Sequence, residues 1–165
     1  MTSIWLIPTP EDAQYLQAII NNLAATYQAP VFSPHCTLYS PTDLPPAELK
    51  QILERSAEDT ISFVVDKEKI NHTENIWKTV FIELIRSPEL EQLQQAVISQ
   101  FPEGQPYEFL PHISLLYKKM SGKQKEDIIR NLHLKNYFKM DKIAAVRTEP
   151  YVDNWETVVE IPFHA

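Results

Sequence analysis

Two short stretches decide how this chain of 165 residues is organised, PHCTL at residues 34–38 and PHISL at residues 111–115. They agree at four of five positions, because both carry a proline, a histidine, a hydroxyl residue and a leucine in the same order. The two histidines lie 77 residues apart (112 − 35). The match predicts an internal duplication with one copy of the stretch in each half of the chain.

Two helix starts repeat at nearly the same interval. Thr9-Pro10-Glu11 and Ser87-Pro88-Glu89 lie 78 residues apart (87 − 9), and each has an N-capping hydroxyl, a proline at the first helical position and an acid in the first turn. Apolar residues follow both starts at helical spacing. Further helices are expected after residues 45 and 121. Strands are expected at residues 3–8, 35–39, 60–65, 77–85, 112–117, 140–146 and 157–163, with a linker at 66–75 and a loop at 102–106.

Each half therefore has the predicted order β-α-β-α-β, which indicates an α+β protein with two pseudo-symmetric halves. At this length the two halves form one domain, residues 1–165, with lobe one at about 1–70 and lobe two at about 76–165. If the lobes pack about a pseudo-twofold axis, the two repeated stretches meet in a central active-site cleft.

The repeated stretches pair an imidazole with a hydroxyl. Side chains alternate across a strand, so His35 and Thr37 share one face, and His112 and Ser114 share one face of the equivalent strand. A neutral imidazole takes a proton from water, an imidazolium protonates a departing oxygen, and hydroxyls hold phosphate oxygens. The pattern predicts hydrolysis of a phosphoester by these four residues. His72, His133 and His164 are scattered, so no metal and no cofactor are expected.

The composition favours a small substrate and a cytoplasmic location. The net charge is −7, whereas proteins that bind long nucleic acids usually carry a basic face. No apolar run approaches the roughly 18 residues of a membrane span, and the first residues lack the features of a signal peptide. The single cysteine, Cys36, excludes an intramolecular disulfide. A monomer is expected.

The chain resembles the two-histidine (2H) phosphoesterase superfamily, and within it most closely the cyclic phosphodiesterases of plants and yeast. The resemblance rests on SIWLIP at residues 3–8, FSPHCTL at 32–38 and PHISLLY at 111–117. It implies a bilobal fold and metal-independent opening of ADP-ribose 1″,2″-cyclic phosphate and nucleoside 2′,3′-cyclic phosphates. It also implies that His35, Thr37, His112 and Ser114 are catalytic, with His112 as base and His35 as acid. Plant members have additional cysteines, which this chain lacks.

Three aromatic residues are further candidates for substrate binding. The resemblance assigns Tyr117 to the substrate site. Strict alternation would put Tyr117 on the other face of the strand from Ser114, unless a bulge brings it back. Tyr39 shares the predicted face of His35. Trp5 is expected to stack on a nucleobase, with a half-buried core position as the alternative. Lys78 is a candidate phosphate partner, with a solvated lysine at a strand edge as the preferred interpretation.

Two other functions stay open. One is an RNA-end 2′,3′-cyclic phosphodiesterase or a 2′–5′ RNA ligase-like enzyme, which would use the same histidines beside a basic groove. The other is a non-catalytic module that binds nucleotides or RNA ends. The intact histidine and hydroxyl residues in both halves argue against the second alternative.

Overall fold

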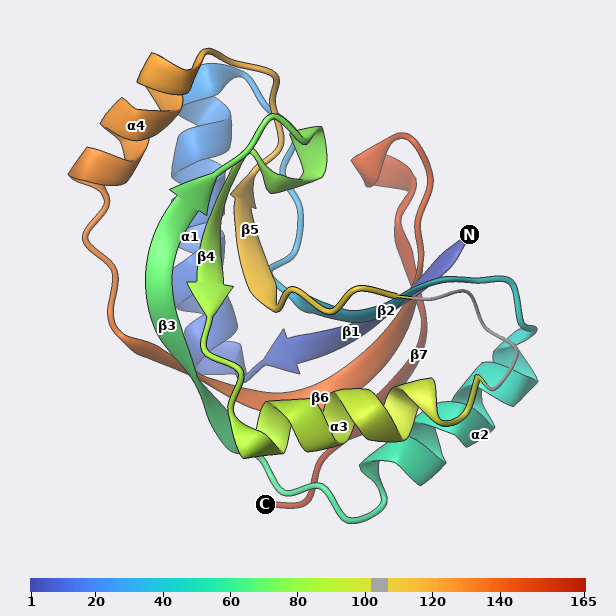
Figure 1. Ribbon diagram of the computed structural model, residues 1–165. Helices are drawn as coiled ribbons and strands as arrows, with labels where there is room; N and C mark the ends of the chain where they lie inside the picture. Colours follow the sequence, from blue (N-terminus) through green and yellow to red (C-terminus); the bar gives the residue numbers. More distant parts are fainter. Residues whose placement is uncertain (102–106) are drawn as a thin grey trace.

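The computed structural model describes residues 1–101 and 107–165 (Figure 1), so the predicted loop at 102–106 lies outside the described residues. The elements follow in the order β1 (Thr2–Pro8), α1 (Pro10–Tyr27), β2 (Cys36–Thr42), α2 (Pro46–Ala57), β3 (Phe63–His72), η1 (Ile76–Lys78), β4 (Val80–Leu84), α3 (Pro88–Ile98), β5 (His112–Leu116), α4 (Gly122–Asn131), β6 (Tyr137–Arg147), η2 (Val152–Asn154) and β7 (Glu156–Pro162). The predicted β-α-β-α-β order of each half is confirmed, with β7 added at the end.

The strands form one antiparallel sheet with the order β2-β1-β6-β3-β4-β5, and β7 pairs with β6. The last strand of each half lies among the strands of the other half. From the second half, β6 pairs with β1; from the first half, β3 pairs with β4. Residues 63–66 of β3 pair with β6, and residues 67–72 pair with β4. The strand β3 therefore joins the two halves of the sheet.

The structure corrects two sequence predictions at the junction between the halves. Residues 66–72 are not a linker but continue β3, with Asp66 paired to β6 and residues 67–72 paired to β4, although their charged residues show no apolar alternation. Trp77 does not lie in a strand but in η1, where the Asn75 side chain accepts a hydrogen bond from the Trp77 backbone at 3.0 Å. Local side-chain bonds of this kind end a strand by competing with its ladder.

The helix starts lie where the sequence predicts them. The Thr9 hydroxyl accepts from the Asp12 backbone, and the Ser87 hydroxyl accepts from the Leu90 backbone. Ser121 forms a capping box with Gln124. The apolar stripes of α1 and α3 are buried.

The helices cover the sheet in two groups (Figure 1). Helix α1 packs against β5 and β1, and α4 packs against β3, whereas α2 packs against β6, β7 and α3. Their apolar faces and the covered strands form a continuous core, which includes Leu16, Ile20, Leu53, Leu90 and Ile113. The other sides of β1, β2 and β5 are left to line a cavity.

Candidate active site

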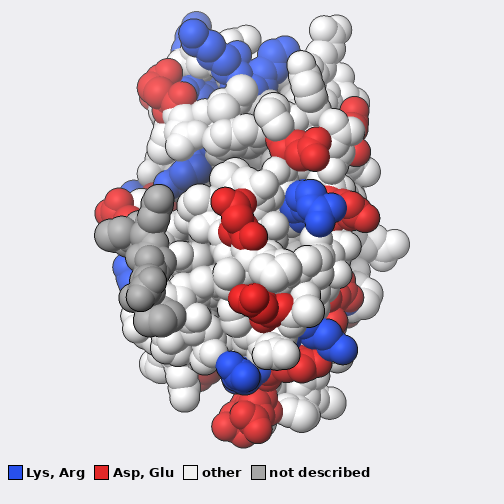
Figure 2. Space-filling model, turned by 90° about the vertical axis from the view of Figure 1, so that its right-hand side faces the viewer, with Lys and Arg blue, Asp and Glu red and all other residues white. Residues whose placement is uncertain are grey.

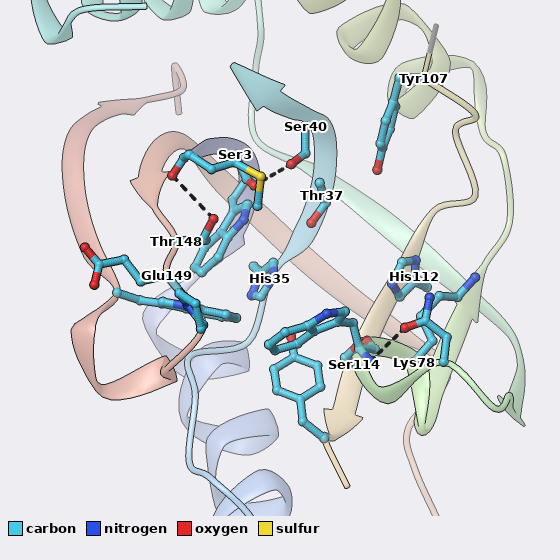
Figure 3. Close-up of a pocket in the computed structure, with 17 residues that line it drawn as sticks. Ser3, His35, Thr37, Ser40, Lys78, Tyr107, His112, Ser114, Thr148 and Glu149 are labelled. Atoms are coloured by element: carbon cyan, nitrogen blue, oxygen red, sulfur yellow. Dashed lines mark hydrogen bonds between the residues drawn. The ribbon is translucent and has the colours of Figure 1, made fainter. Parts of the chain in front are cut away.

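The four residues of the repeated stretches line one cavity of about 690 Å³. His35 immediately precedes β2 and Thr37 lies in it, while His112 and Ser114 come from β5. Figure 3 shows these side chains pointing into the same space from the two elements. The convergence expected from pseudo-symmetry is therefore present in the described structure.

A bulge in β2 separates Thr37 from Tyr39. Trp5 is paired with Thr37, but the preceding residue, Ile4, is paired with Tyr39, so Leu38 is an extra residue in β2. Thr37 and Ser40 consequently line the cavity, whereas Tyr39 turns into the core. Strict alternation from His35 predicted that Tyr39 lines the cavity, and this prediction was wrong. Its ring is 4% exposed and stacks on Phe101.

The same irregularity recurs in β5. Phe81 is paired with Ser114, and the preceding residue, Val80, is paired with Leu116, so Leu115 is the extra residue. The shift brings Tyr117 back to the side of Ser114, where it lines the cavity as the resemblance implies. The Tyr117 ring is almost buried and stacks on Phe32 at a centroid distance of 3.8 Å.

A buried glutamine on α3 supports the bulge in β2. The Gln94 amide nitrogen donates to the Leu38 carbonyl at 3.2 Å, and the Gln94 side chain is 1% exposed. A buried carbonyl without a donor costs about 1–3 kcal/mol. Gln94 therefore stabilises the backbone that separates Thr37 from Tyr39. In the sequence Gln94 is one of several polar residues of an amphipathic helix, and nothing distinguishes it from the exposed ones.

Both histidines are held in the same tautomer. His35 Nδ1 lies 2.8 Å from the Ser33 carbonyl, and His112 Nδ1 lies 2.6 Å from the Leu110 carbonyl. A carbonyl oxygen only accepts, so each Nδ1 carries a hydrogen and donates it. In the neutral ring this leaves Nε2 unprotonated and free to act as a base.

Burial lowers the pKa of both imidazoles. The pKa of His35 falls to about 4 because burial disfavours its charged form; the bond to Ser33 opposes the shift and the His112 charge adds to it. Burial also lowers the pKa of His112, where Lys78 acts in the same direction and Glu83 opposes it. Both rings are therefore neutral at pH 7 in the unliganded protein.

The two hydroxyls differ in their partners. Ser114 Oγ donates to the Trp77 carbonyl at 2.8 Å, so it must leave this acceptor in order to donate to a ligand. Thr37 is half-buried and lines the cavity opposite. Cys36, between His35 and Thr37, points into the core, and burial raises the pKa of its thiol to about 12.

All three tryptophans of the sequence line the cavity, namely Trp5, Trp77 and Trp155. Trp155 lies after η2 in the β6–β7 connection, and its ring is 5.9 Å from that of Trp77. Sequence reasoning missed Trp155, because it belongs to no repeated motif. It also missed the remaining residues of the wall, some of them labelled in Figure 3: Met1, Ser3, Ser40, Asn75, Tyr107, Thr148, Glu149 and Pro150.

Lys78 lies in the cavity wall rather than at a solvated strand edge. Its ammonium group is 5.0 Å from the centre of the Phe81 ring. Among the described residues that line the cavity, Lys78 is the one lysine or arginine and Glu149 the one carboxylate. The wall is therefore mostly aromatic and hydroxylic.

Within residues 1–101 and 107–165, no group of three or more histidine, cysteine or acidic side chains is arranged to hold a metal ion. His72 lies near Glu126, and His164 bonds the Glu58 carbonyl, far along the chain from the repeated stretches. In the same residues no helix combines the length and apolar character required to cross a membrane.

Comparisons with known proteins agree with this geometry. Residues 8–149 match the model of the 2′-5′ RNA ligase superfamily. The chain is 21% identical to a protein named cyclic phosphodiesterase from Arabidopsis thaliana, with 94% of this chain and 91% of that protein covered. Among solved structures, it resembles E. coli LigT complexed with 3′-AMP, with a TM-score of 0.67 and 14% identity over 99% of this chain and 98% of that chain. It also resembles the protein TT0787 of Thermus thermophilus, with a TM-score of 0.70 and 13% identity over 98% of this chain and 97% of that chain.

Proposed function

Because the chain belongs to the 2′-5′ RNA ligase superfamily, we propose that it is a phosphodiesterase that hydrolyses a small nucleotide cyclic phosphate to the ring-opened monophosphate. One observation carries the proposal: two histidine–hydroxyl pairs from opposite halves of the chain line the same cavity. The likeness to a protein named cyclic phosphodiesterase supports a hydrolase that acts on phosphodiester bonds.

In the proposed reaction, a water oxygen bonds to phosphorus on one side while the bond to a ring oxygen breaks on the other. His112, which is less buried than His35, removes the water proton through Nε2. His35 donates the proton on its Nε2 to the departing oxygen. It acquires that proton when the anionic substrate binds, because an opposite charge raises the pKa of an imidazole. His112 then releases the proton taken from water to solvent, which leaves both rings neutral again.

Thr37 and Ser114 donate to the non-bridging phosphate oxygens in this scheme. Donors aimed at oxygens that hold charge in the transition state are each worth about 10²–10³-fold in kcat. Ser114 rotates away from the Trp77 carbonyl to reach the phosphate. Lys78, the one lysine or arginine among the described residues of the wall, supplies positive charge.

The cavity suits a mononucleotide. Its volume lies within the roughly 300–1,000 Å³ of small-molecule sites. Trp77 and Trp155 offer aromatic surface to a nucleobase, and one lysine matches one phosphate charge. We therefore place nucleoside 2′,3′-cyclic phosphates first and ADP-ribose 1″,2″-cyclic phosphate, which has two more phosphates, second.

An RNA end is the second candidate substrate, favoured by the family name and by the likeness to LigT. Acidic and basic side chains are interspersed over most of the face drawn in Figure 2, and basic ones gather only near its upper end. With a net charge of −7, such a surface offers little attraction to an extended RNA. A non-catalytic binding module is disfavoured because both pairs line the cavity.

The test compares turnover of 2′,3′-cyclic AMP, ADP-ribose 1″,2″-cyclic phosphate and an RNA with a cyclic-phosphate end at one salt concentration. We expect the mononucleotide to give the highest kcat/KM. His35→Ala and His112→Ala should each lower kcat by about 10²–10⁴-fold, and the double variant should be little worse than the poorer single variant. Near-normal turnover by either single variant would refute the mechanism, and no turnover of any substrate by the unmodified protein would refute the function.

A further inference from the structure

The imidazole of His35 lies flat on the indole of Trp5. The two ring centroids are 3.5 Å apart and the planes differ by 7°. In the second half Phe81 takes the equivalent place, since Trp5 is paired with Thr37 and Phe81 with Ser114. The Phe81 ring meets His112 edge-on, at 5.5 Å and 75°. A parallel stack is therefore present at one histidine only.

The Trp5 indole is itself held in place by its surroundings. Ala144 lies directly opposite Trp5 on β6, and its small side chain leaves room for the large ring. Val146 and the edge of the Trp155 ring, at 5.7 Å, complete a small apolar cluster beside it. As a result Trp5 is 5% exposed, although it lines the cavity.

This arrangement argues against the sequence expectation that Trp5 stacks on a nucleobase. A base needs a free aromatic face, and the imidazole of His35 occupies one face of this indole. The rest of the ring is enclosed by Ala144, Val146 and Trp155. Trp77, in contrast, is 43% exposed at the cavity wall and has aromatic surface to offer.

We propose that Trp5 is a positioning residue that sets the plane of the His35 imidazole for proton transfer to the departing oxygen. Two contacts determine where Nε2 points. The bond from Nδ1 to the Ser33 carbonyl sets the rotation of the ring, and the stack on Trp5 sets its tilt. The stack also persists when the ring is protonated, because an indole face attracts a cation. This role rests on the function proposed above.

Kinetics with a purine and a pyrimidine substrate test the proposal. In Trp5→Leu the stack is lost, so kcat for 2′,3′-cyclic AMP and 2′,3′-cyclic UMP should fall by the same factor, about 10–100-fold, with KM within about twofold of the unmodified protein. Trp5→Phe, which keeps an aromatic face and copies the residue of the second half, should recover most of the loss. A rise in KM that is larger for the purine, with kcat unchanged, would show instead that Trp5 is a nucleobase platform and would overturn the proposal.

Phe138→Leu is the matched control, because it removes a fully buried ring from β6 without touching either histidine. It should lower stability and leave kcat and KM unchanged. A kcat loss in Phe138→Leu as large as that in Trp5→Leu would mean that reduced stability of the fold accounts for both losses. That result would also overturn the proposal.

An NMR measurement keeps the inference separate from the proposed function. The Ser33 carbonyl selects the tautomer protonated on Nδ1 only while the ring stays aligned with it. The nitrogen shifts of the neutral His35 ring should therefore show one tautomer in the unmodified protein and a mixture in Trp5→Leu, where loss of the stack lets the ring tilt away from this carbonyl. If the unmodified protein turned over no cyclic phosphate, the function would fail while this result could still support the positioning of the ring. An unchanged single tautomer in Trp5→Leu would overturn the positioning role.

Discussion

Acid should destabilise the fold through His35. Burial holds the pKa of this imidazole at about 4 in the folded protein, against 6.5 for an ordinary histidine. Between these two pH values the unfolded chain binds a proton that the folded chain excludes. The stability contribution of neutral His35 is therefore fully present above pH 6.5, and it is lost as the pH falls from 6.5 to about 4.

The size of this loss follows from the shift. A difference of 2.5 units (6.5 − 4) at 1.36 kcal/mol per unit corresponds to about 3 kcal/mol. His35 is 7% exposed, so solvent screens the effect little. For a protein whose free energy of unfolding is about 5–15 kcal/mol, the loss is a large fraction of the whole.

The variant His35→Asn isolates the contribution. An asparagine amide nitrogen can take the place of imidazole Nδ1 and still donate to the Ser33 carbonyl, but the side chain does not titrate. Free energies of unfolding are measured by urea titration at pH 4, 5, 6 and 7. The unmodified protein should lose about 3 kcal/mol more than the variant between pH 7 and pH 4, and the less buried His112, replaced in His112→Asn, should account for a smaller share. If the free energy of unfolding fell by the same amount between pH 7 and pH 4 in the unmodified protein and in His35→Asn, the reasoning would be refuted.

The hydroxyls, the pH dependence of turnover and the metal requirement give three further predictions. Thr37→Ala and Ser114→Ala should each lower kcat by about 10²–10³-fold, whereas Thr37→Ser and Ser114→Thr should cost far less; alanine variants with unchanged kcat would make the hydroxyls structural. Ser114→Ala should also lower the free energy of unfolding by about 0.5–1.5 kcal/mol, because the Trp77 carbonyl loses its donor. The plot of kcat/KM against pH should be bell-shaped with its maximum below pH 6.5, since the pKa of both imidazoles is lowered, that of His35 to about 4; a maximum above pH 8 would contradict this. Turnover should survive exhaustive EDTA treatment, and a loss that zinc or magnesium reverses would rule out the two-histidine mechanism.

Local chemistry explains why much of this protein was predictable from its sequence. The hydroxyl-proline-acid starts at Thr9 and Ser87 encode helices through short-range hydrogen bonds and backbone preferences. Alternation over two or three residues was sufficient to put His35 with Thr37 and His112 with Ser114. The repeat then predicted that the two pairs belong to equivalent places in one fold.

Predictions failed where the outcome depended on distant partners. Residues 67–72, which are mostly polar, form a strand because β4 pairs with them, and a run of charged residues lacks the hydrophobic periodicity by which a strand is recognised from sequence. Tyr39 turned into the core because of the bulge at Leu38, whose carbonyl is satisfied by Gln94 from a helix of the other half. One extra residue reverses the side of every residue after it.

The sequence was therefore sufficient for the repeated order of elements, the helix caps and the shared face of each histidine and its hydroxyl, because each depends on interactions between near neighbours in the chain. The pairing of β6 with β1 and of β3 with β4, the arrival of Trp155 at the cavity and the stack of Trp5 on His35 depended on tertiary packing. These contacts join residues that are far apart in the chain or lie in different strands. Their geometry is set by how the sheet twists, bulges and packs as a whole, which no local pattern of residues encodes.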